Sequence, residues 1–232
     1  STGGDPWLDE DFADTTTPFG SMSGLKSIGG HVGDGVASVI PKGQHWGSTG
    51  HWNLADNGHR GVEEVYWRYW LRFPDGFRVD SPARGKLPGP AGLYTYNCLG
   101  GRVSTASAPC WSARMLFSPL NPGEGTPQRN VDVDEVTRIG SYVYHLDGPS
   151  NRGDVLLWDV DVATLDHGRW YCVEGRIDLN TPGQHDGVLQ GWVDGKAAYS
   201  RSNLRFRRSG ESNIDVKSFW FDVYYGGSET SP

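Results

Sequence analysis

The sequence predicts an all-β protein, built as an antiparallel sandwich or jelly roll. Three observations support this prediction: apolar residues recur with a period of two, convincing helical periodicity is nearly absent, and turn motifs separate the alternating segments. The chain of 232 residues contains 33 glycines and 14 prolines, which suits many tight turns. It also contains 10 Trp, 10 Tyr and 8 Phe, which favour one packed core. With no internal repeat and no linker, residues 1–232 are expected to form a single domain.

The expected strands follow one another along most of the chain. The clearest covers residues 65–73, where every second side chain, beginning with Val65, is apolar and shares one face. Asp194-Gly195 is expected to be the turn of a two-residue hairpin that leads into residues 197–199. Further strands are expected, in chain order, at residues 35–40, 111–117, 141–146, 155–158, 170–179, 188–193 and 214–225.

The opposite face of several expected strands carries arginine and aromatic residues in place of the ordinary polar residues of a solvated face. On residues 65–73 this face holds Tyr66, Arg68, Trp70 and Arg72. Aromatic rings can stack on pyranose faces, and guanidinium groups can pair with uronate carboxylates. The pattern indicates a sheet that binds an acidic sugar chain; alternatively, a second sheet covers this face and the aromatic residues are core. The same pattern recurs at Ser112, Arg114, Tyr142, Tyr144, Gln190, Trp192, Trp220, Asp222 and Tyr224.

The charge and hydropathy patterns argue against several classes of protein. The chain carries 21 Lys and Arg against 28 Asp and Glu, a formal net charge of −7, whereas nucleic-acid-binding proteins normally carry a basic stripe. No apolar run approaches the length of a membrane-spanning helix, which needs about 20 residues. We expect a monomer with no nucleic-acid and no membrane partner.

The three cysteines indicate the compartment. Cys98 and Cys110 bracket a loop rich in Gly, Ser and Pro, and we expect a disulfide bond between them. Cys172 lies in an expected strand and is interpreted as a buried thiol. No pair has the Cys-x-x-Cys spacing of a zinc or redox site. One disulfide bond suits a secreted, extracellular protein whose signal peptide has been removed.

Several common kinds of catalytic or metal site find little support in the sequence. A glycosidase needs a carboxylate on each side of the scissile bond, and the acidic candidates, Asp222 among them, form no compelling pair. His45, His51 and His59 are six and eight residues apart in a loop, which is poor spacing for zinc. A structural calcium held by acidic turns is left open, without EF-hand-like spacing to support it. β-Elimination on a uronate needs no metal, because a cation, a base and an acid such as tyrosine suffice.

Several motifs, in one order along the chain, resemble polysaccharide lyases of families 14 and 20. The resemblance covers about residues 62–227, and its ordered set of motifs is more specific than any one of them. It implies a concanavalin-like β-jelly roll with a concave substrate groove, and endo-acting cleavage of a polyuronate by β-elimination. The motifs are Tyr69-Trp70-Leu71-Arg72-Phe73-Pro74-Asp75-Gly76-Phe77, Gly85-Lys86-Leu87-Pro88-Gly89, Ser112-Ala113-Arg114, Tyr142-Val143-Tyr144-His145, Leu179-Asn180-Thr181-Pro182-Gly183, Asp186-Gly187-Val188-Leu189, Trp192-Val193-Asp194-Gly195 and Tyr224-Tyr225-Gly226-Gly227.

The resemblance also implies roles for individual residues. Lys86, Arg114, Tyr142 and Tyr144 occupy positions that are catalytic or bind the carboxylate, with Ser112 beside them. It implies β-1,4-glucuronan as the substrate, with alginate next, and no cofactor for catalysis. Further substrate contacts are expected from Arg68, Arg72, Gln190, Trp192 and Tyr224.

Two alternatives remain open at this point. A noncatalytic, lectin-like carbohydrate-binding module on the same fold would keep the aromatic residues but would not need Lys86, Arg114 and Tyr144 together. Tyr142 and Tyr144 are two residues apart in a strand and share a face, so either could be the acid or the base. His145 points to the opposite face and is expected to be structural.

Overall fold

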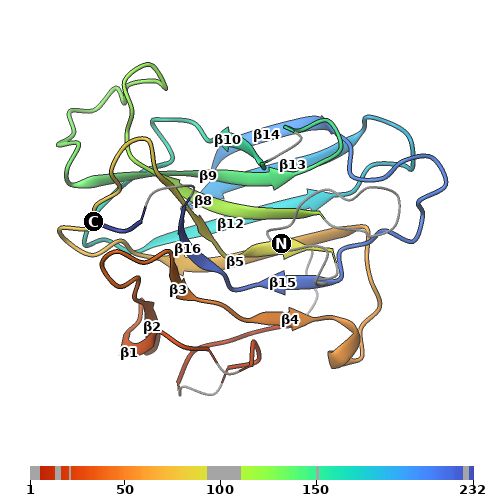
Figure 1. Cartoon of the computed structure of the whole chain (residues 1–232), viewed down its shortest axis with the longest axis horizontal. Coiled ribbons are helices and arrows are strands. Elements are labelled where there is room, and N and C mark those ends of the chain that lie inside the picture. The colour runs from red at the N-terminus through yellow and green to blue at the C-terminus, as the bar shows by residue number, and fades with distance from the viewer. Residues whose placement is uncertain (1–5, 14–16, 21, 93–110, 150–151, 227–229) are drawn as a thin grey trace.

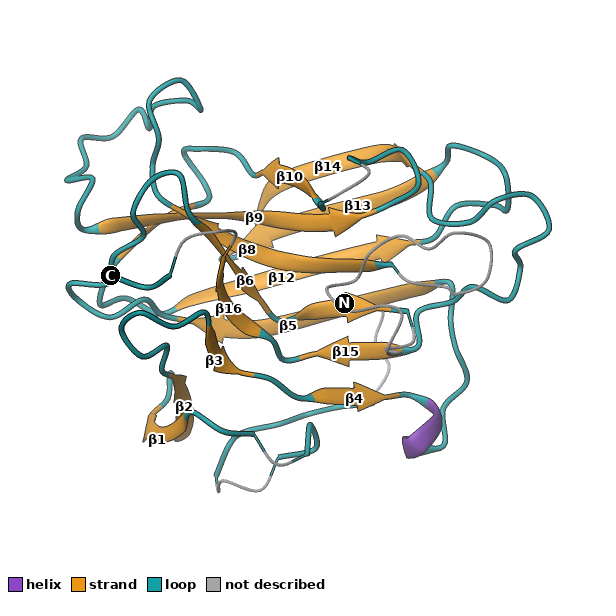
Figure 2. Ribbon diagram, viewed as in Figure 1, coloured by secondary structure: helices purple, strands orange, loops and turns teal. Residues whose placement is uncertain are grey.

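The computed structural model describes residues 6–13, 17–20, 22–92, 111–149, 152–226 and 230–232. Within these ranges the regular structure is almost entirely β, with a single 3₁₀ turn, η1, at Ala55–Asn57 (Figure 2). Two antiparallel sheets pack against each other as a β-jelly roll, which confirms the fold class that the sequence predicts.

The larger sheet has ten strands and lies in front in Figure 1. Its strands are β3 (Trp46–Ser48), β4 (His51–Asn53), β6 (Arg84–Leu87), β7 (Gly89–Ala91), β8 (Ser112–Ser118), β9 (Val136–Tyr144), β10 (Asp154–Leu157), β11 (Thr164–Asp166), β15 (Ser218–Trp220) and β16 (Val223–Gly226). Seven of them follow the order β3-β16-β6-β8-β7-β15-β4, and β9 pairs with β8, β10 and β11.

The smaller sheet has four strands in the order β14-β13-β12-β5. Its turn at Asp194-Gly195 joins β13 to β14, and both residues have positive φ, 50° and 74°. This confirms the predicted two-residue hairpin, because such turns need the left-handed region that glycine reaches without strain. The four strands are β5 (Glu64–Leu71), β12 (Tyr171–Asp178), β13 (Gly187–Val193) and β14 (Lys196–Leu204).

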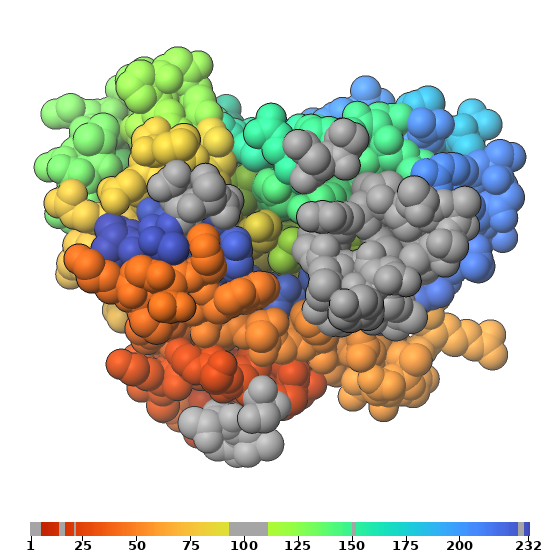
Figure 3. All heavy atoms as spheres, in the orientation of Figure 1, coloured from red at the N-terminus to blue at the C-terminus, as the bar shows by residue number. Residues whose placement is uncertain are grey.

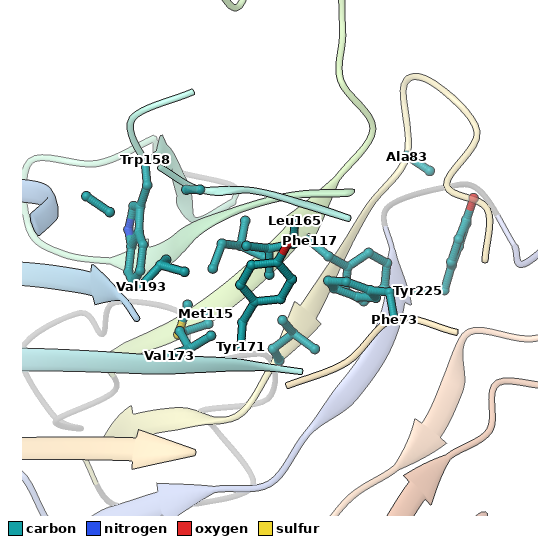
Figure 4. Close-up of a cluster of buried hydrophobic side chains, with 14 residues drawn as sticks. Phe73, Ala83, Met115, Phe117, Trp158, Leu165, Tyr171, Val173, Val193 and Tyr225 are labelled. Atoms are coloured by element: carbon teal, nitrogen blue, oxygen red, sulfur yellow. The ribbon is translucent and has the colours of Figure 1, made fainter. Parts of the chain in front are cut away.

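The hydrophobic core lies between the two sheets. Alternate side chains of β5 and β12 in the smaller sheet meet alternate side chains of β8 and β9 in the larger sheet. Figure 4 shows one of two clusters at this interface, to which both sheets contribute. Buried members of the two clusters include Trp67, Phe73, Ala113, Met115, Phe117, Val143, Trp158, Tyr171, Val173 and Ile177.

The segment expected to form one strand at residues 214–225 forms two strands instead. β15 pairs with β4 and β7, whereas β16 pairs with β3 and β6, so the chain crosses to another position in the sheet. Phe221 and Asp222 lie between these strands. The separate hairpin of β1 (Leu25–Gly29) and β2 (Asp34–Ser38) lies beside β3 in Figure 1.

Candidate active site

Five of the predicted site residues come together on the outer face of the larger sheet. Pairing places Tyr224 of β16 opposite Lys86 of β6, and Arg114 of β8 opposite Tyr142 of β9. Tyr144 lies two residues further along β9. Directly opposite residues of antiparallel strands share a face, and side chains alternate along each strand. The five side chains therefore point away from the core, which receives the intervening residues Ala113, Met115 and Val143.

The face that carries these residues is hollowed. In Figure 3 a depression lies near the centre, between the orange N-terminal strands, the blue C-terminal segment and the green segment that contains β9. At the edge strand β3, Trp46 is 54% exposed and its ring lies edge-on to Tyr224, with 4.6 Å between centroids. His45 stacks on the same tyrosine. These rings form an aromatic rim beside the predicted catalytic residues.

Lys86 is enclosed by aromatic rings. Its Nζ lies 4.8 Å from the ring centroid of Tyr142 and 4.4 Å from that of Tyr224. Burial and the positive charge of Arg114 lower the pKa of Lys86 to about 7, while Asp222 acts in the opposite direction. At neutral pH the amine is therefore present in both protonated and neutral forms, as general acid–base catalysis requires.

Arg114 is a buried cation beneath the groove. Its side chain is 2% exposed, and Nη1 lies 3.3 Å from Oδ2 of Asp222. Its guanidinium group also lies 5.4 Å from the ring centroid of Trp220. A buried charge is costly unless it is paired, so Asp222 explains how this arginine is tolerated. Arg114 lies below the surface, where its charge contributes to the electric field at the groove floor.

Asp222 is held by two further groups besides Arg114. Thr49 donates a hydrogen bond to Oδ1 at 2.5 Å, and Nε2 of His51 lies 3.3 Å from the same oxygen. Burial raises the pKa of Asp222, but His51, Arg114 and Thr49 together outweigh this effect and hold the pKa below its usual range. The carboxylate is thus charged at neutral pH and neutralises Arg114 in part.

The two tyrosines of β9 differ in their surroundings. Their rings lie edge to face, with centroids 5.5 Å apart. The hydroxyl of Tyr142 accepts a hydrogen bond from the backbone N–H of Gly153 at 3.0 Å, which leaves its own proton available for donation. Ser112 is paired opposite Tyr144 and is fully buried; its Oγ has no hydrogen-bond partner among the described residues.

Four residues expected in the same groove do not lie there. Arg68 belongs to β5, Gln190 and Trp192 belong to β13, and Arg72 follows β5; all are in or next to the smaller sheet. Their inward neighbours are core residues, so these side chains lie on the far side of the sandwich from Lys86. The expectation of one shared groove is therefore wrong. Alternation along a strand tells which residues share a face, but it does not tell which sheet the strand joins.

The contact between Asp222 and His51 cannot be predicted from the sequence. In the sequence, Asp222 is one of several acidic residues and a member of the aromatic face, and His51 lies in a loop with His45 and His59. The one available signal was the alternation Trp220, Asp222, Tyr224. No group of three or more His, Cys, Asp or Glu side chains in the described part of the chain is arranged to hold a metal ion.

The sequence also supports predictions about His145, the three cysteines and membrane-spanning helices. His145 is buried and Nε2 lies 3.2 Å from Oδ2 of Asp154, which confirms that it faces away from the tyrosines. Cys172 is half-buried on the outer face of β12, not fully buried, because it alternates with core residues. Cys98 and Cys110 lie outside the described residues. No described helix is long and apolar enough to cross a membrane.

Comparisons with known proteins agree with this fold. The family model of polysaccharide lyase 14 matches residues 35–231. The chain is similar to the PL-14 alginate lyase from Aplysia kurodai, with 17% identity and a TM-score of 0.64, covering 92% of this chain and 86% of that one. It is also similar to a variant of alginate lyase Aly36B in complex with alginate tetrasaccharide, with 18% identity and a TM-score of 0.60, covering 92% and 82%.

A third similar structure is that of a lyase named for a different polymer, glucuronan. The endo-β-1,4-glucuronan lyase from the fungus Trichoderma reesei is 13% identical, with a TM-score of 0.50, and the match covers 90% of this chain and 77% of that one. No curated protein sequence matches the chain at a significant level. At these identities the solved structures establish the shared fold.

Proposed function

The chain belongs to polysaccharide lyase family 14, and on this basis we propose that it cleaves a polyuronate by β-elimination in the groove around Lys86. The observation that carries the proposal is the placement of an amine with a pKa of about 7 between two tyrosine rings, above a buried arginine. Such a set supplies a base, an acid and a positive field within one site. The alginate tetrasaccharide bound to Aly36B supports an acidic polysaccharide as the class of substrate.

The reaction needs one proton to leave C5 of a uronate and one proton to reach O4. When a base removes the C5 proton, negative charge develops on the C6 carboxylate as an enolate. The electron pair then forms the C4–C5 double bond while the bond from C4 to O4 breaks. An acid protonates O4, which becomes the new end of the departing chain.

We assign these steps to the residues at the groove floor. Neutral Lys86 takes the C5 proton, because its lowered pKa makes the free amine available near neutral pH. Tyr144 or Tyr142, whose rings lie edge to face, donates a proton to O4. Arg114 supplies positive charge from below, which favours the enolate, with its additional negative charge, over the ground-state uronate. Tyr224 and Trp46 provide rings on which sugar units can stack.

The deciding experiment follows the ultraviolet absorbance of the unsaturated uronate while the protein is mixed with polyuronates. We expect absorbance to rise with β-1,4-glucuronan, polymannuronate or polyguluronate, and the polymer length to fall early, as in endo cleavage. A noncatalytic binding module would bind a polymer without any rise in absorbance, and that result would refute the proposal. The preference for glucuronan over alginate stays a prediction, which the ratio of kcat/KM values tests directly.

A further inference from the structure

The outer face of the smaller sheet carries large aromatic side chains that packing leaves exposed. On β5, Tyr66 is 49% exposed and Trp70 is 46% exposed, although His31 stacks on the indole of Trp70. The two residues are four positions apart on one face, which separates them by about 13 Å along the strand. Single exposed aromatics are ordinary on protein surfaces, whereas a group of them marks a binding surface.

Polar groups suited to sugars lie between these rings. Strand pairing places Tyr66 opposite Arg176, and Arg176 opposite Gln190. The guanidinium group of Arg176 lies 5.7 Å from the Tyr66 ring centroid and donates a hydrogen bond to Oε1 of Gln190 at 3.0 Å. The amide nitrogen of Gln190 is thereby oriented away from Arg176. Trp192 lies two residues further along β13, on the same face.

The charges on this face leave two arginines without an ion pair. Arg176 forms ion pairs with both Glu64 and Asp178. Neither Arg68 nor Arg72 forms an ion pair with any residue in the described ranges. Arg72 instead lies over the ring of Trp170, 5.0 Å from its centroid.

One carboxylate opposes these two cations on the same face. Glu174 is paired opposite Arg68 and lies next to Trp192 in register. The group of Arg176, Glu64 and Asp178 carries a formal charge of −1. The excess of positive charge is therefore confined to the end of the face at Arg68 and Arg72, where two guanidinium groups lie against the single carboxylate of Glu174. In a chain of net charge −7 this local excess of positive charge is complementary to an anion.

We propose that this outer face, defined by Tyr66, Arg68, Trp70, Arg72 and Trp192, is a second binding surface for an acidic polysaccharide. Rings would stack on the pyranose faces, and the two free guanidinium groups would bind carboxylates of the same chain. The hydrophobic core separates this surface from Lys86, so a polymer bound here leaves the groove open. This surface keeps the enzyme bound to its polymer during cleavage. The choice of a polyuronate as that polymer rests on the proposed function, whereas the binding surface itself does not.

Native affinity electrophoresis tests this proposal. Gels contain glucuronan or polymannuronate in large excess over protein, and matched gels contain a neutral cellulose derivative. Every protein carries Lys86→Met to slow cleavage. In the acidic gels, we expect Tyr66→Ala/Trp70→Ala to reduce retardation and to raise the dissociation constant derived from it about tenfold, because two stacking contacts are lost. Trp7→Ala, which removes a 49% exposed indole elsewhere, is the matched control and should leave retardation unchanged.

Two further variants separate direct binding from indirect effects. Arg68→Gln/Arg72→Gln should weaken retardation in acidic gels and reduce its dependence on salt. His31→Ala removes the stacking partner and keeps Trp70, so it should retain retardation. Equal retardation of the Tyr66→Ala/Trp70→Ala variant and its parent would overturn the proposal. An equal loss of retardation in the His31→Ala variant would also overturn it. The same holds if the parent protein is retarded as strongly in neutral gels as in acidic gels.

Turnover distinguishes failure of this inference from failure of the proposed function. With Lys86 intact, Tyr66→Ala/Trp70→Ala should cleave a uronate tetrasaccharide at the parental kcat/KM, because so short a chain cannot reach both faces. If no polyuronate is cleaved but retardation in acidic gels still depends on Tyr66 and Trp70, the proposed function fails and the second surface stands. If polymer is cleaved while retardation depends only on groove residues, the second surface is refuted.

Discussion

Lys86 occupies a position where its charged form is poorly solvated. The folded protein lowers its pKa from 10.5 to about 7, chiefly by burial. Between these two pH values the unfolded chain binds a proton that the folded chain does not, so stability rises with pH across this window. Below about pH 7 the full cost of burying the ammonium group is present. A lysine kept at such a position indicates a functional demand on the amine.

Lys86→Met tests both consequences of this burial. The variant keeps a chain of similar length without the charge, so we expect it to lose turnover. We also expect a higher melting temperature than wild type at pH 6, and a difference that shrinks toward pH 10. Thermal unfolding followed by circular dichroism at pH 6, 8 and 10 measures this difference. A variant that is less stable at pH 6, or that still cleaves polymer, would contradict the role given to Lys86.

The pH dependence of wild-type activity follows from the same pKa. If neutral Lys86 is the base, kcat/KM should rise as pH increases through about 7. Initial rates at constant ionic strength between pH 5 and pH 9 measure the profile. A rate that falls through pH 7 would instead assign the protonated ammonium to the reaction.

Tyr144→Phe and Tyr142→Phe separate proton transfer from packing. Each variant keeps the ring and removes only the hydroxyl, so stacking of the sugar should persist. A positioned acid or base contributes about 10²–10⁴ to the rate, so we expect kcat to fall by at least a hundredfold in the variant that lacks the proton donor. KM should change little. Normal turnover by both folded variants would refute a tyrosine-based elimination.

At the scale of the elements, two glycines allow the smaller sheet to approach the core tryptophans. Gly175 of β12 and Gly191 of β13 are paired directly opposite each other. A Cβ at Gly175 would lie 2.2 Å from the Trp67 ring, and one at Gly191 would lie 2.3 Å from the Trp158 ring. The absence of two side chains thus makes room for two indoles.

Gly191→Ala should destabilise the fold without touching the groove. The added methyl must displace the buried ring of Trp158, and such overpacking typically costs about 1–3 kcal/mol. Urea unfolding measures the loss, while kcat below the unfolding transition should stay at the wild-type value. Gly29→Ala is the matched control, because a Cβ there meets no atom within 4 Å. Equal stability of the two variants would show that the sheets can separate freely at this point.

The break between β15 and β16 positions Asp222 in the site. The chain leaves β15 after Trp220, changes its neighbours, and enters β16 at Val223. Asp222 lies in this crossing and reaches Arg114 of β8, which is 108 residues away in sequence. A continuous strand could not make both sets of pairings, so the break is what brings the carboxylate to the buried arginine.

At the scale of the whole molecule, the site and the second surface use opposite faces of one sandwich. The net charge of −7 would repel a polyanion, and binding depends on local cations on each face. Arg114 is partly neutralised by Asp222, so the groove carries a smaller positive field than its two cations alone would produce. The outer surface contributes unpaired guanidinium groups instead.

Chelation tests whether the elimination uses side chains alone. Lys86, the two tyrosines and Arg114 supply the base, the acid and the charge that the reaction needs, so we expect exhaustive EDTA treatment to leave the initial rate unchanged. Loss of thermal stability without loss of initial rate would indicate a structural calcium. An initial rate that disappears and returns with added metal would show that the assignment of roles is wrong.

The sequence alone determined the all-β class and the strand faces, and it predicted a site of Lys86, Arg114, Tyr142, Tyr144 and Tyr224, which the structure places together on one face. These depend on local alternation and on ordered motifs, both of which are written along the chain. The tertiary structure decided which strands share a sheet: it moved the expected contacts at Arg68, Arg72, Gln190 and Trp192 to the other face. It also brought Asp222 and His51 beneath the groove. Strand pairing between distant segments sets these positions, and alternation within a strand carries no information about its partner.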